Sequence, residues 1–338
     1  MSIELENPPE DTVSQIAFSP GDAGPFIACS SWDGTVRIWN LNDTLSAAQV
    51  YHILREKKQA VLCLCWSPDG RSLYYGTTKG EIKVCNIEKK GQAETLCTVA
   101  GPISGIDFWE TGSSIIFCTL NGILAGCDAN SGDVQYLDKI DSKKIYTSLK
   151  IGTNALYVST VTSEPTKDLS PPENQFLKID LTKEPKPKPV SERRLNVPIM
   201  CFDVGANDID WIVGYVNGQV EYFTQDDHES KIEKGHRSET GASKQMYSVN
   251  CIAMSRERPF CISGGGDTTL HSFNLKNRRT KPSKFGKTPT AMCLSYKQGA
   301  LAVATGNDYS KGSGSYYVEK ESNPTSVIIK KLTQADYA

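Results

Sequence analysis

Histidine, cysteine and glycine are the residues of this sequence that could supply catalysis or hold a metal ion. Only four histidines occur among 338 residues, and none lies in a His-Glu-x-x-His helix or beside a Gly-x-Ser-x-Gly turn. His271 falls inside a repeated strand, where a histidine is expected to pack rather than to react. Catalysis needs a nucleophile or an acid–base pair held in one site. The sequence therefore predicts a protein that is not an enzyme.

Two further patterns resemble ligand sites but lack residues that such sites need. Cys63 and Cys65 form the closest cysteine pair, and no second pair or histidine set lies at the spacing of a zinc site. Strand alternation places both thiols on one face, so buried core cysteines are expected. Gly286-Lys287-Thr288 resembles the end of a phosphate-binding loop, but Lys281 stands where that loop requires glycine. We expect no metal and no cofactor.

A short basic segment is the strongest candidate for binding. Residues 276–287 carry six basic side chains and no acid, in a chain whose 37 Lys and Arg face 39 Asp and Glu for a formal net charge of -2. This concentration suits phosphate groups or an acidic partner, although a solvated outer strand would have the same composition. The candidates for contact with RNA or an acidic partner are Lys276, Arg278, Arg279, Lys281, Lys284 and Lys287.

Composition limits the class of protein. With 38% hydrophobic and 22% charged residues the chain is globular, and no run approaches the roughly 20 apolar residues that span a bilayer. The first six residues are acidic and no apolar segment follows them, so no secretory signal is expected. Eleven cysteines are an odd number, and most stand in apolar runs, where free cysteine packs as a small hydrophobic side chain. We expect a reduced, intracellular protein.

The elements that would position these residues follow one repeated pattern. A turn residue, often next to glycine, precedes a short strand of alternating apolar residues that ends in a large residue and a polar one. The closing polar residues lie 42 to 56 positions apart, at Asn40, Asn86, Asp128, Asp180, Thr224, Asn274 and Lys330. This spacing brackets the roughly 40–45 residue period of a propeller blade, and loop insertions supply the excess.

Two further series of strands run in phase with the first. Apolar strands begin at Val13, Val61, Ile103, Ile145, Ile199, Val249 and Thr290, and a second apolar run follows each of them. Three series repeated seven times predict an all-β fold of seven four-stranded blades, in which the fourth strand is the variable outer one. Two separate β-sandwiches would not explain a period held from end to end. We expect one seven-bladed β-propeller domain over residues 1–338.

A closed ring of blades must pair its two ends, because an unpaired strand would leave an open edge. The seventh repeat lacks a fourth strand, and Ile3-Glu4-Leu5 alternates apolar and polar residues before Pro8-Pro9. We expect this N-terminal strand to complete the last blade. Long surface loops are expected near residues 163–174 and near the proline-rich residues 182–190.

Several stretches resemble one family of WD40-repeat proteins, that of the nuclear-pore mRNA export factor and its sister, the mitotic-checkpoint propeller. Ser31-Trp32-Asp33 and the following Val36-Arg37-Ile38-Trp39 are similar to the family's first blade, and residues 7–20 resemble its N-terminal signature. More specific are Gly235-His236-Arg237-Ser238 and Asp308-Tyr309-Ser310-Lys311-Gly312. The last motif resembles the export factor more than the checkpoint protein.

The resemblance implies an adaptor of the nuclear pore in mRNA export, located in the nucleus and also in the cytoplasm. Members of the family clamp a short nucleoporin segment, the GLEBS motif, and their export complex is associated with single-stranded RNA. Carried over by motif, Trp32 and Arg237 would anchor the peptide. Asp308, Tyr309 and Lys311 would form a nearby rim, with Lys311 and the basic segment available to RNA phosphates.

Alternatives to these interpretations stay open at the level of sequence. His236 also fits the structural Gly-His of an ordinary WD repeat, and Trp32 could pack between blades. Leu120 stands where the family's third blade usually offers tryptophan, so a peptide contact there would be weaker or different. A checkpoint adaptor that binds kinases at kinetochores is the second functional hypothesis, and a substrate receptor of a ubiquitin ligase is the third.

Overall fold

The structure, a computed structural model, consists of strands and the turns between them. None of the residues that it describes forms an α-helix, so none forms a helix of the length and hydropathy needed to cross a membrane. The described residues are 2–20, 25–111, 113–138, 143–162, 173–182, 189–195, 197–205, 208, 210–223, 230–240, 243–276, 279–295, 299–307, 324–333 and 336.

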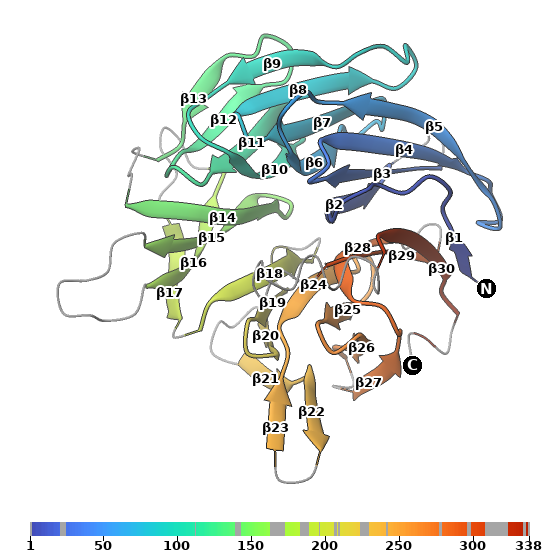
Figure 1. Cartoon of the computed structure of the whole chain (residues 1–338). Helices are drawn as coiled ribbons and strands as arrows, with labels where there is room; N and C mark the ends of the chain where they lie inside the picture. Colours follow the sequence, from blue (N-terminus) through green and yellow to red (C-terminus); the bar gives the residue numbers. More distant parts are fainter. Residues whose placement is uncertain are drawn as a thin grey trace. The chain divides into compact units, whose positions relative to one another are not determined.

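Seven sheets of four strands make up the fold, one for each repeat of the sequence (Figure 1). Within each of the first six sheets the strands follow one another in chain order. The expectation of an all-β, seven-bladed propeller is confirmed. All three predicted series of strands recur in every blade, and a fourth strand completes each blade.

The first strands of the first four blades begin within one residue of the predicted positions. Blade 1 contains β2 (Val13–Phe18), β3 (Phe26–Ser31), β4 (Thr35–Leu41) and β5 (Ala48–Arg55). Blade 2 contains β6 (Val61–Trp66), β7 (Ser72–Thr77), β8 (Glu81–Asn86) and β9 (Glu94–Thr98). Blade 3 contains β10 (Ile103–Trp109), β11 (Ser114–Thr119), β12 (Leu124–Asp128) and β13 (Val134–Tyr136). Blade 4 contains β14 (Lys144–Ile151), β15 (Ala155–Thr162), β16 (Asn174–Asp180) and β17 (Pro189–Leu195).

The last three blades follow the same plan. Blade 5 contains β18 (Ile199–Val204), β19 (Trp211–Tyr215), β20 (Gln219–Phe223) and β21 (Ser230–Lys234). Blade 6 contains β24 (Val249–Met254), β25 (Phe260–Gly265), β26 (Thr269–Asn274) and β27 (Arg279–Lys284). Blade 7 contains β28 (Pro289–Ser295), β29 (Ala300–Thr305) and β30 (Ser326–Lys331), with β1 (Ser2–Glu4) as its fourth strand.

The chain divides into two compact units, which are described separately. Unit 1 comprises Met1–Phe18, Trp39–Tyr51 and Ile199–Ala338, and it holds blades 5, 6 and 7. Unit 2 comprises Ser19–Ile38 and His52–Pro198, and it holds blades 2, 3 and 4. The strands of blade 1 are shared between the two units. A single domain over residues 1–338 stays a prediction.

In blades 1, 2, 3, 6 and 7 burial decreases from the second strand to the fourth. β25 and β29 are buried at every residue, whereas β27 is exposed at every residue. The second strands are therefore apolar without alternation, as strands covered on both faces are. In β6 both Cys63 and Cys65 are buried, with exposed fractions of 1% and 6%. The expectation of core cysteines at these two positions is confirmed.

Neighbouring blades within each unit are joined through their first strands. In unit 2 the Cys63 thiol donates to Ile103 O at 3.4 Å. In unit 1 the Cys201 thiol donates to Val249 O at 3.3 Å, and Asp203 Oδ2 accepts from Met254 N at 2.7 Å. These bonds satisfy main-chain groups at the start and end of the next blade's first strand. They fix the spacing of adjacent blades within a unit.

The N-terminal strand completes the last blade, as expected. β1 pairs with β30 in an antiparallel register, with Ile3 opposite Ile329. The ladder continues beyond β1, because Leu5 N donates to Val327 O at 2.8 Å, and Leu5 is only 2% exposed. The edge of β30 is therefore covered, which removes a site for pairing with another chain.

One element was not expected from the repeat. The strands β22 (Arg237–Thr240) and β23 (Ser243–Met246) form a two-stranded sheet between blades 5 and 6 in the sequence, and Figure 1 shows them as a separate hairpin. The expected loops near 163–174 and 182–190 lie largely outside the described residues.

Deleting residues 1–7 should destabilise the protein. The deletion removes the buried Leu5 side chain and uncovers the hydrogen-bonding edge of β30, which together should cost about 3 kcal/mol or more. Thermal melting and urea unfolding measure the change. The variant Ser2→Ala keeps the strand and changes only an exposed side chain, so it should melt like the unmodified protein. Equal melting of the deletion and the full chain would contradict the role given to β1.

Candidate functional site

Trp32 stands at a tight turn between β3 and β4, in unit 2. Asp33 N donates to Ser31 Oγ at 3.1 Å, and Thr35 N donates to Asp33 Oδ1 at 2.8 Å. Asp33 Oδ2 also lies 3.7 Å from the Arg37 guanidinium. These contacts hold the turn on both sides of Trp32, whose side chain is 50% exposed. The indole is thus presented on a rigid turn and is not packed away within its unit.

The residue before the turn is apolar and exposed in two further blades. Leu120 and Val216 take the place of Trp32 in blades 3 and 5, where each precedes Asn-Gly, and they are 39% and 40% exposed. Gly218 of the blade-5 turn has a φ of 78°, a conformation that glycine adopts at little cost. Leu120 therefore offers an aliphatic surface at the position where the resemblance implies tryptophan.

Arg237 opens the β22–β23 hairpin, in unit 1. Arg237 is exposed, and its partner across the ladder, Met246, is 65% exposed. The base of the hairpin is tied to the blade-5 turn, because His236 N donates to Gly218 O at 3.1 Å and Tyr247 N donates to His236 O at 3.0 Å. Arg237 is thereby held at the same end of blade 5 as Val216.

Met200 brings another exposed apolar side chain to this end of blade 5. It lies at a register shift of β18 between Ile199 and Cys201, and Ile199 pairs with Tyr215 next to the turn. An extra residue at such a bulge points its side chain in a new direction, and Met200 is 41% exposed. We call Met200, Val216 and Met246 the blade-5 apolar set. Sequence reasoning missed it, because strand alternation does not reveal bulges and the hairpin was not expected.

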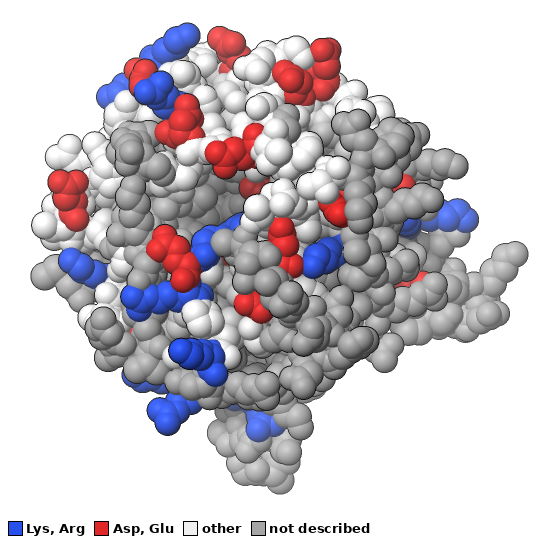
Figure 2. All heavy atoms as spheres, turned by 180° about the vertical axis from the view of Figure 1, so that it is seen from behind, with Lys and Arg blue, Asp and Glu red and all other residues white. Residues whose placement is uncertain are grey.

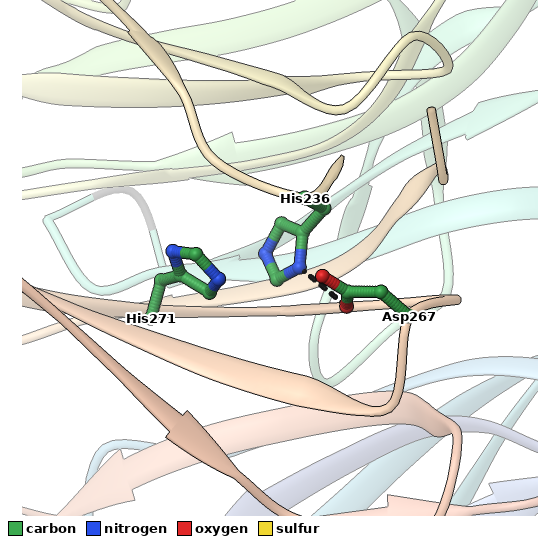
Figure 3. Close-up of side chains that lie close together, drawn as sticks. All are labelled: His236, Asp267 and His271. Atoms are coloured by element: carbon green, nitrogen blue, oxygen red, sulfur yellow. Dashed lines mark hydrogen bonds and ion pairs between the residues drawn. The ribbon is translucent and has the colours of Figure 1, made fainter. Parts of the chain in front are cut away.

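His236 lies under this surface in a buried hydrogen-bond chain (Figure 3). Its side chain is 0% exposed. His236 Nδ1 lies 2.8 Å from Asp267 Oδ1, and His236 Nε2 lies 2.8 Å from Ser263 Oγ. The ring of His271 packs against that of His236 with centroids 4.4 Å apart, and His271 Nε2 lies 3.0 Å from Thr269 Oγ1. These hydrogen bonds fix the side chain of His236, the residue that precedes Arg237.

His236, Asp267 and His271 also form the one group of three potential metal ligands found among the described residues, with ligand atoms within 4.8 Å of one another. The sequence spacing did not suggest this group. Both ring nitrogens of His236 already have partners at 2.8 Å, whereas zinc needs a free nitrogen lone pair at about 2.0–2.1 Å. Metal binding would break one of these bonds inside a closed core. The geometry favours a structural role for His236.

The two ionisable neighbours of His236 have shifted pKa values. Burial and, to a smaller extent, the adjacent His236 lower the pKa of His271 to about 4, because a charged ring is disfavoured in this environment. Burial acts to raise the pKa of Asp267, but hydrogen bonds from His236 and Thr269 outweigh it, so this pKa lies below its usual value. His271 is therefore neutral and Asp267 ionised near neutral pH.

The basic segment lies mainly on β27, the outer strand of blade 6. Arg279, Lys281 and Lys284 of this strand are exposed, and so is Lys276 in the turn before it. In Figure 2, which shows the molecule from behind, Lys and Arg side chains gather at the lower left, on the side where β27 lies. The strand thus offers several exposed cations, with Arg279 and Lys281 on one face and Lys284 on the other.

Lys287 is engaged differently from the other residues of the basic segment. Its Nζ lies 3.1 Å from Glu4 Oε1 and donates to Ser326 Oγ at 3.1 Å. It therefore ties β1 to the remainder of blade 7. Four other proposed contact residues, Arg278, Asp308, Tyr309 and Lys311, lie outside the described residues. The expected rim and residues 277 and 278 of the turn before β27 are therefore outside the described residues.

Comparison with known proteins finds the same repeat. The family models that match are the anaphase-promoting complex subunit 4 WD40 domain, over residues 26–111, and the WD domain, G-beta repeat, over residues 4–40. The poly(A)+ RNA export protein of Schizosaccharomyces pombe is 25% identical, over 98% of this chain and 91% of its own length. Protein Rae1 of Drosophila melanogaster is 27% identical, over 91% of this chain and 88% of its own length.

Solved structures share the fold at lower sequence identity. The structure of U3-55K matches with a TM-score of 0.75 and 13% identity, and covers 98% of both chains. The crystal structure of the RRP9 WD40 repeats matches with a TM-score of 0.76 and 14% identity, over 98% of this chain and 97% of that one. At these identities the likeness concerns the fold alone.

Lowering the pH from about 6.5 to about 4 should destabilise the fold through His271. In the unfolded chain a histidine titrates near about 6.5, whereas the folded pKa is about 4, so the unfolded state gains the proton first and is favoured as the pH falls. Allowing for partial solvent access, we expect about 1–2 kcal/mol. Asp267 affects stability at lower pH than His271 does. Its ionised form stabilises the fold and is lost only as the pH falls below about 3.9, the pKa of aspartate in the unfolded chain.

Urea unfolding at several pH values, with His271→Gln as the comparison, isolates this effect. Glutamine can keep a hydrogen bond to Thr269 but does not titrate. The unfolding free energy of His271→Gln should therefore fall less than that of the unmodified chain between pH 6.5 and 4. Identical pH dependence of the two proteins would rule out the titration assigned to His271.

Proposed function

We propose that this chain, which carries WD40-type repeats and is similar along nearly its whole length to mRNA export factors, is a non-enzymatic adaptor in mRNA export. It acts in the nucleus at the nuclear pore complex, and also in the cytoplasm, by holding a GLEBS-type nucleoporin peptide. The observation that carries the proposal is the set of rigid turns that present exposed apolar side chains and Arg237.

Trp32 has the properties of a peptide anchor in unit 2. Its turn is fixed by hydrogen bonds on both sides, so little freedom is lost when a ligand covers the indole. Tryptophan and arginine are enriched among the residues that carry most of the energy of an interface. Leu120, in the same unit, adds an aliphatic contact at the equivalent turn of blade 3.

Arg237 offers a complementary kind of contact in unit 1. Its guanidinium can hold a carboxylate with two parallel hydrogen bonds. The blade-5 apolar set beside it contains two methionines, whose flexible side chains adapt to varied apolar surfaces. Met200, Val216 and Met246 are all exposed. This surface suits a peptide in which an acidic residue lies near apolar ones.

The basic residues of β27 are proposed to contact single-stranded RNA. Lys276, Arg279, Lys281 and Lys284 are exposed, with Arg279 and Lys281 on one face of β27 and Lys284 on the other. Pro282 lies within the same strand, and proline together with lysine discourages the addition of another strand at a sheet edge. The contact would thus be made by side chains. β27 contains no aromatic residue, so binding would depend on phosphate charge rather than on stacking of bases.

Truncating either anchor should weaken peptide binding. We expect Trp32→Ala and Arg237→Ala each to raise the Kd for a GLEBS-type nucleoporin peptide tenfold or more, a loss of about 1.4 kcal/mol or more. Fluorescence anisotropy with a labelled peptide measures it. Matched controls are Tyr136→Ala, an exposed aromatic on the outer strand β13, and Arg258→Ala, exposed on the loop between β24 and β25.

Two results would overturn parts of this proposal. If both anchor variants bind as well as the controls, the peptide does not use these turns. If the unmodified protein fails to bind the peptide at all, the adaptor function is wrong. Proteins that co-purify with the tagged chain then distinguish the other hypotheses, because checkpoint kinases would indicate a kinetochore adaptor and a ligase subunit would indicate a substrate receptor.

Removing two lysines from β27 should weaken RNA binding and its dependence on salt. For single strands, log K falls with log salt by about 0.7 for each neutralised phosphate, so Lys281→Ala with Lys284→Ala should lower that slope by up to about 1.4. Filter binding of oligouridine at several salt concentrations gives the slope. The pair Lys57→Ala with Lys89→Ala removes two exposed lysines of unit 2 as a control. Equal slopes for both pairs would refute the RNA contact.

A further inference from the structure

Two thiols from different blades meet within unit 2. Cys97 lies on β9, the outer strand of blade 2, and is half-buried, whereas Cys127 lies on β12 of blade 3 and is fully buried. Cys127 is part of one apolar cluster, and Cys97 packs against the same cluster. Neither cysteine is part of a disulfide.

Core packing brings these two side chains together. Across their ladders Cys97 lies opposite Ile82 and Cys127 lies opposite Ile115, and all four belong to or pack against one apolar cluster. The turn after β12 approaches β9 closely, since a Cβ on Gly132 would come within 2.3 Å of Leu96 O. The contact is therefore set by the backbone of both blades.

Cys97 differs chemically from the other cysteines whose pKa is shifted. Burial raises the pKa of Cys85 to about 11 and that of Cys118 to about 12. The hydrogen bond from Cys127 lowers the pKa of Cys97 below its usual value despite partial burial. The same contact, with burial, raises the pKa of Cys127. Partly exposed thiols with thiolate character beside a second thiol are the ones that oxidise selectively.

We propose that Cys97 and Cys127 form a reversible dithiol–disulfide pair that is oxidised by hydrogen peroxide. The Cys97 thiolate attacks one peroxide oxygen, the O–O bond breaks, and the released hydroxide takes a proton to become water. The Cys127 sulfur then attacks the Cys97 sulfenic acid, the S–O bond breaks, and the leaving hydroxide departs with the thiol proton as a second water. The two thiols lose two electrons, which reduce one peroxide molecule.

The disulfide would tie the outer strand of blade 2 to blade 3. A bridge between positions 97 and 127 closes a loop of about 30 residues and restricts the unfolded chain, which stabilises the folded state unless the bridge is strained. Oxidation would thus stiffen a blade edge without altering Trp32 or Arg237. The proposal does not depend on the function in mRNA export.

The test uses the full-length protein treated with hydrogen peroxide. Free thiols are alkylated with iodoacetamide before digestion, and the digest is analysed by mass spectrometry without reduction. Cleavage after Glu110 by a glutamate-specific protease separates Cys97 from Cys127, which trypsin would leave on one peptide. We expect a cross-linked pair containing Cys97 and Cys127 that disappears with dithiothreitol, together with a higher Tm in the oxidised sample.

Three variants keep the proposal falsifiable. Cys97→Ser should abolish the cross-link, whereas Cys127→Ser should leave Cys97 as a sulfenic acid that dimedone labels. Cys85→Ser, in the same sheet as Cys97, should leave the cross-link intact. Full alkylation of Cys97 and Cys127 after peroxide, or a bridge from Cys97 to another cysteine, would overturn the pairing.

Discussion

One main-chain hydrogen bond recurs in four blades and organises the end of each blade where the candidate anchors stand. The segment that follows the outer strand donates an N–H to the carbonyl of the turn between the second and third strands. The pairs are Glu56 N with Gly34 O at 2.8 Å, Val99 N with Gly80 O at 2.9 Å, His236 N with Gly218 O at 3.1 Å, and Phe285 N with Thr268 O at 3.0 Å. Since only backbone atoms take part, the side chains around each turn are free to differ.

The polar groups beneath these turns do differ from blade to blade. In blade 6 His236 bonds to Asp267 and Ser263. In blade 2 Glu56 instead accepts from Tyr75 Oη and Lys83 Nζ, each at 2.7 Å, and these bonds outweigh burial and hold the pKa of Glu56 below its usual value. Both sets satisfy buried polar atoms, as a stable core requires. Blades built on one backbone plan can therefore carry distinct surfaces, among them Trp32 and the blade-5 apolar set.

The sequence predicted the regular parts of this structure and missed the irregular ones. Period and alternation placed the three inner strands of every blade, and the pattern at Ile3 placed the closing strand, because each depends on burial that repeats. The hairpin after His236 interrupts the repeat and has no apolar alternation of its own. Met200 is exposed by a bulge, and His236 meets Asp267 across 31 positions. Such features arise from three-dimensional packing, which residue spacing does not encode.

The pairing of β1 with β30 also depends on the order in which the two strands are synthesised. Residues 2–4 are made early, yet their partners at 328–330 are made more than 300 residues later. At a translation rate of about 5–20 residues per second, the N-terminal segment waits roughly 20–60 s before its ladder can form. During synthesis that segment is an available strand for any open sheet edge nearby, so the order in which blades mature on the ribosome bears on whether the last one closes correctly.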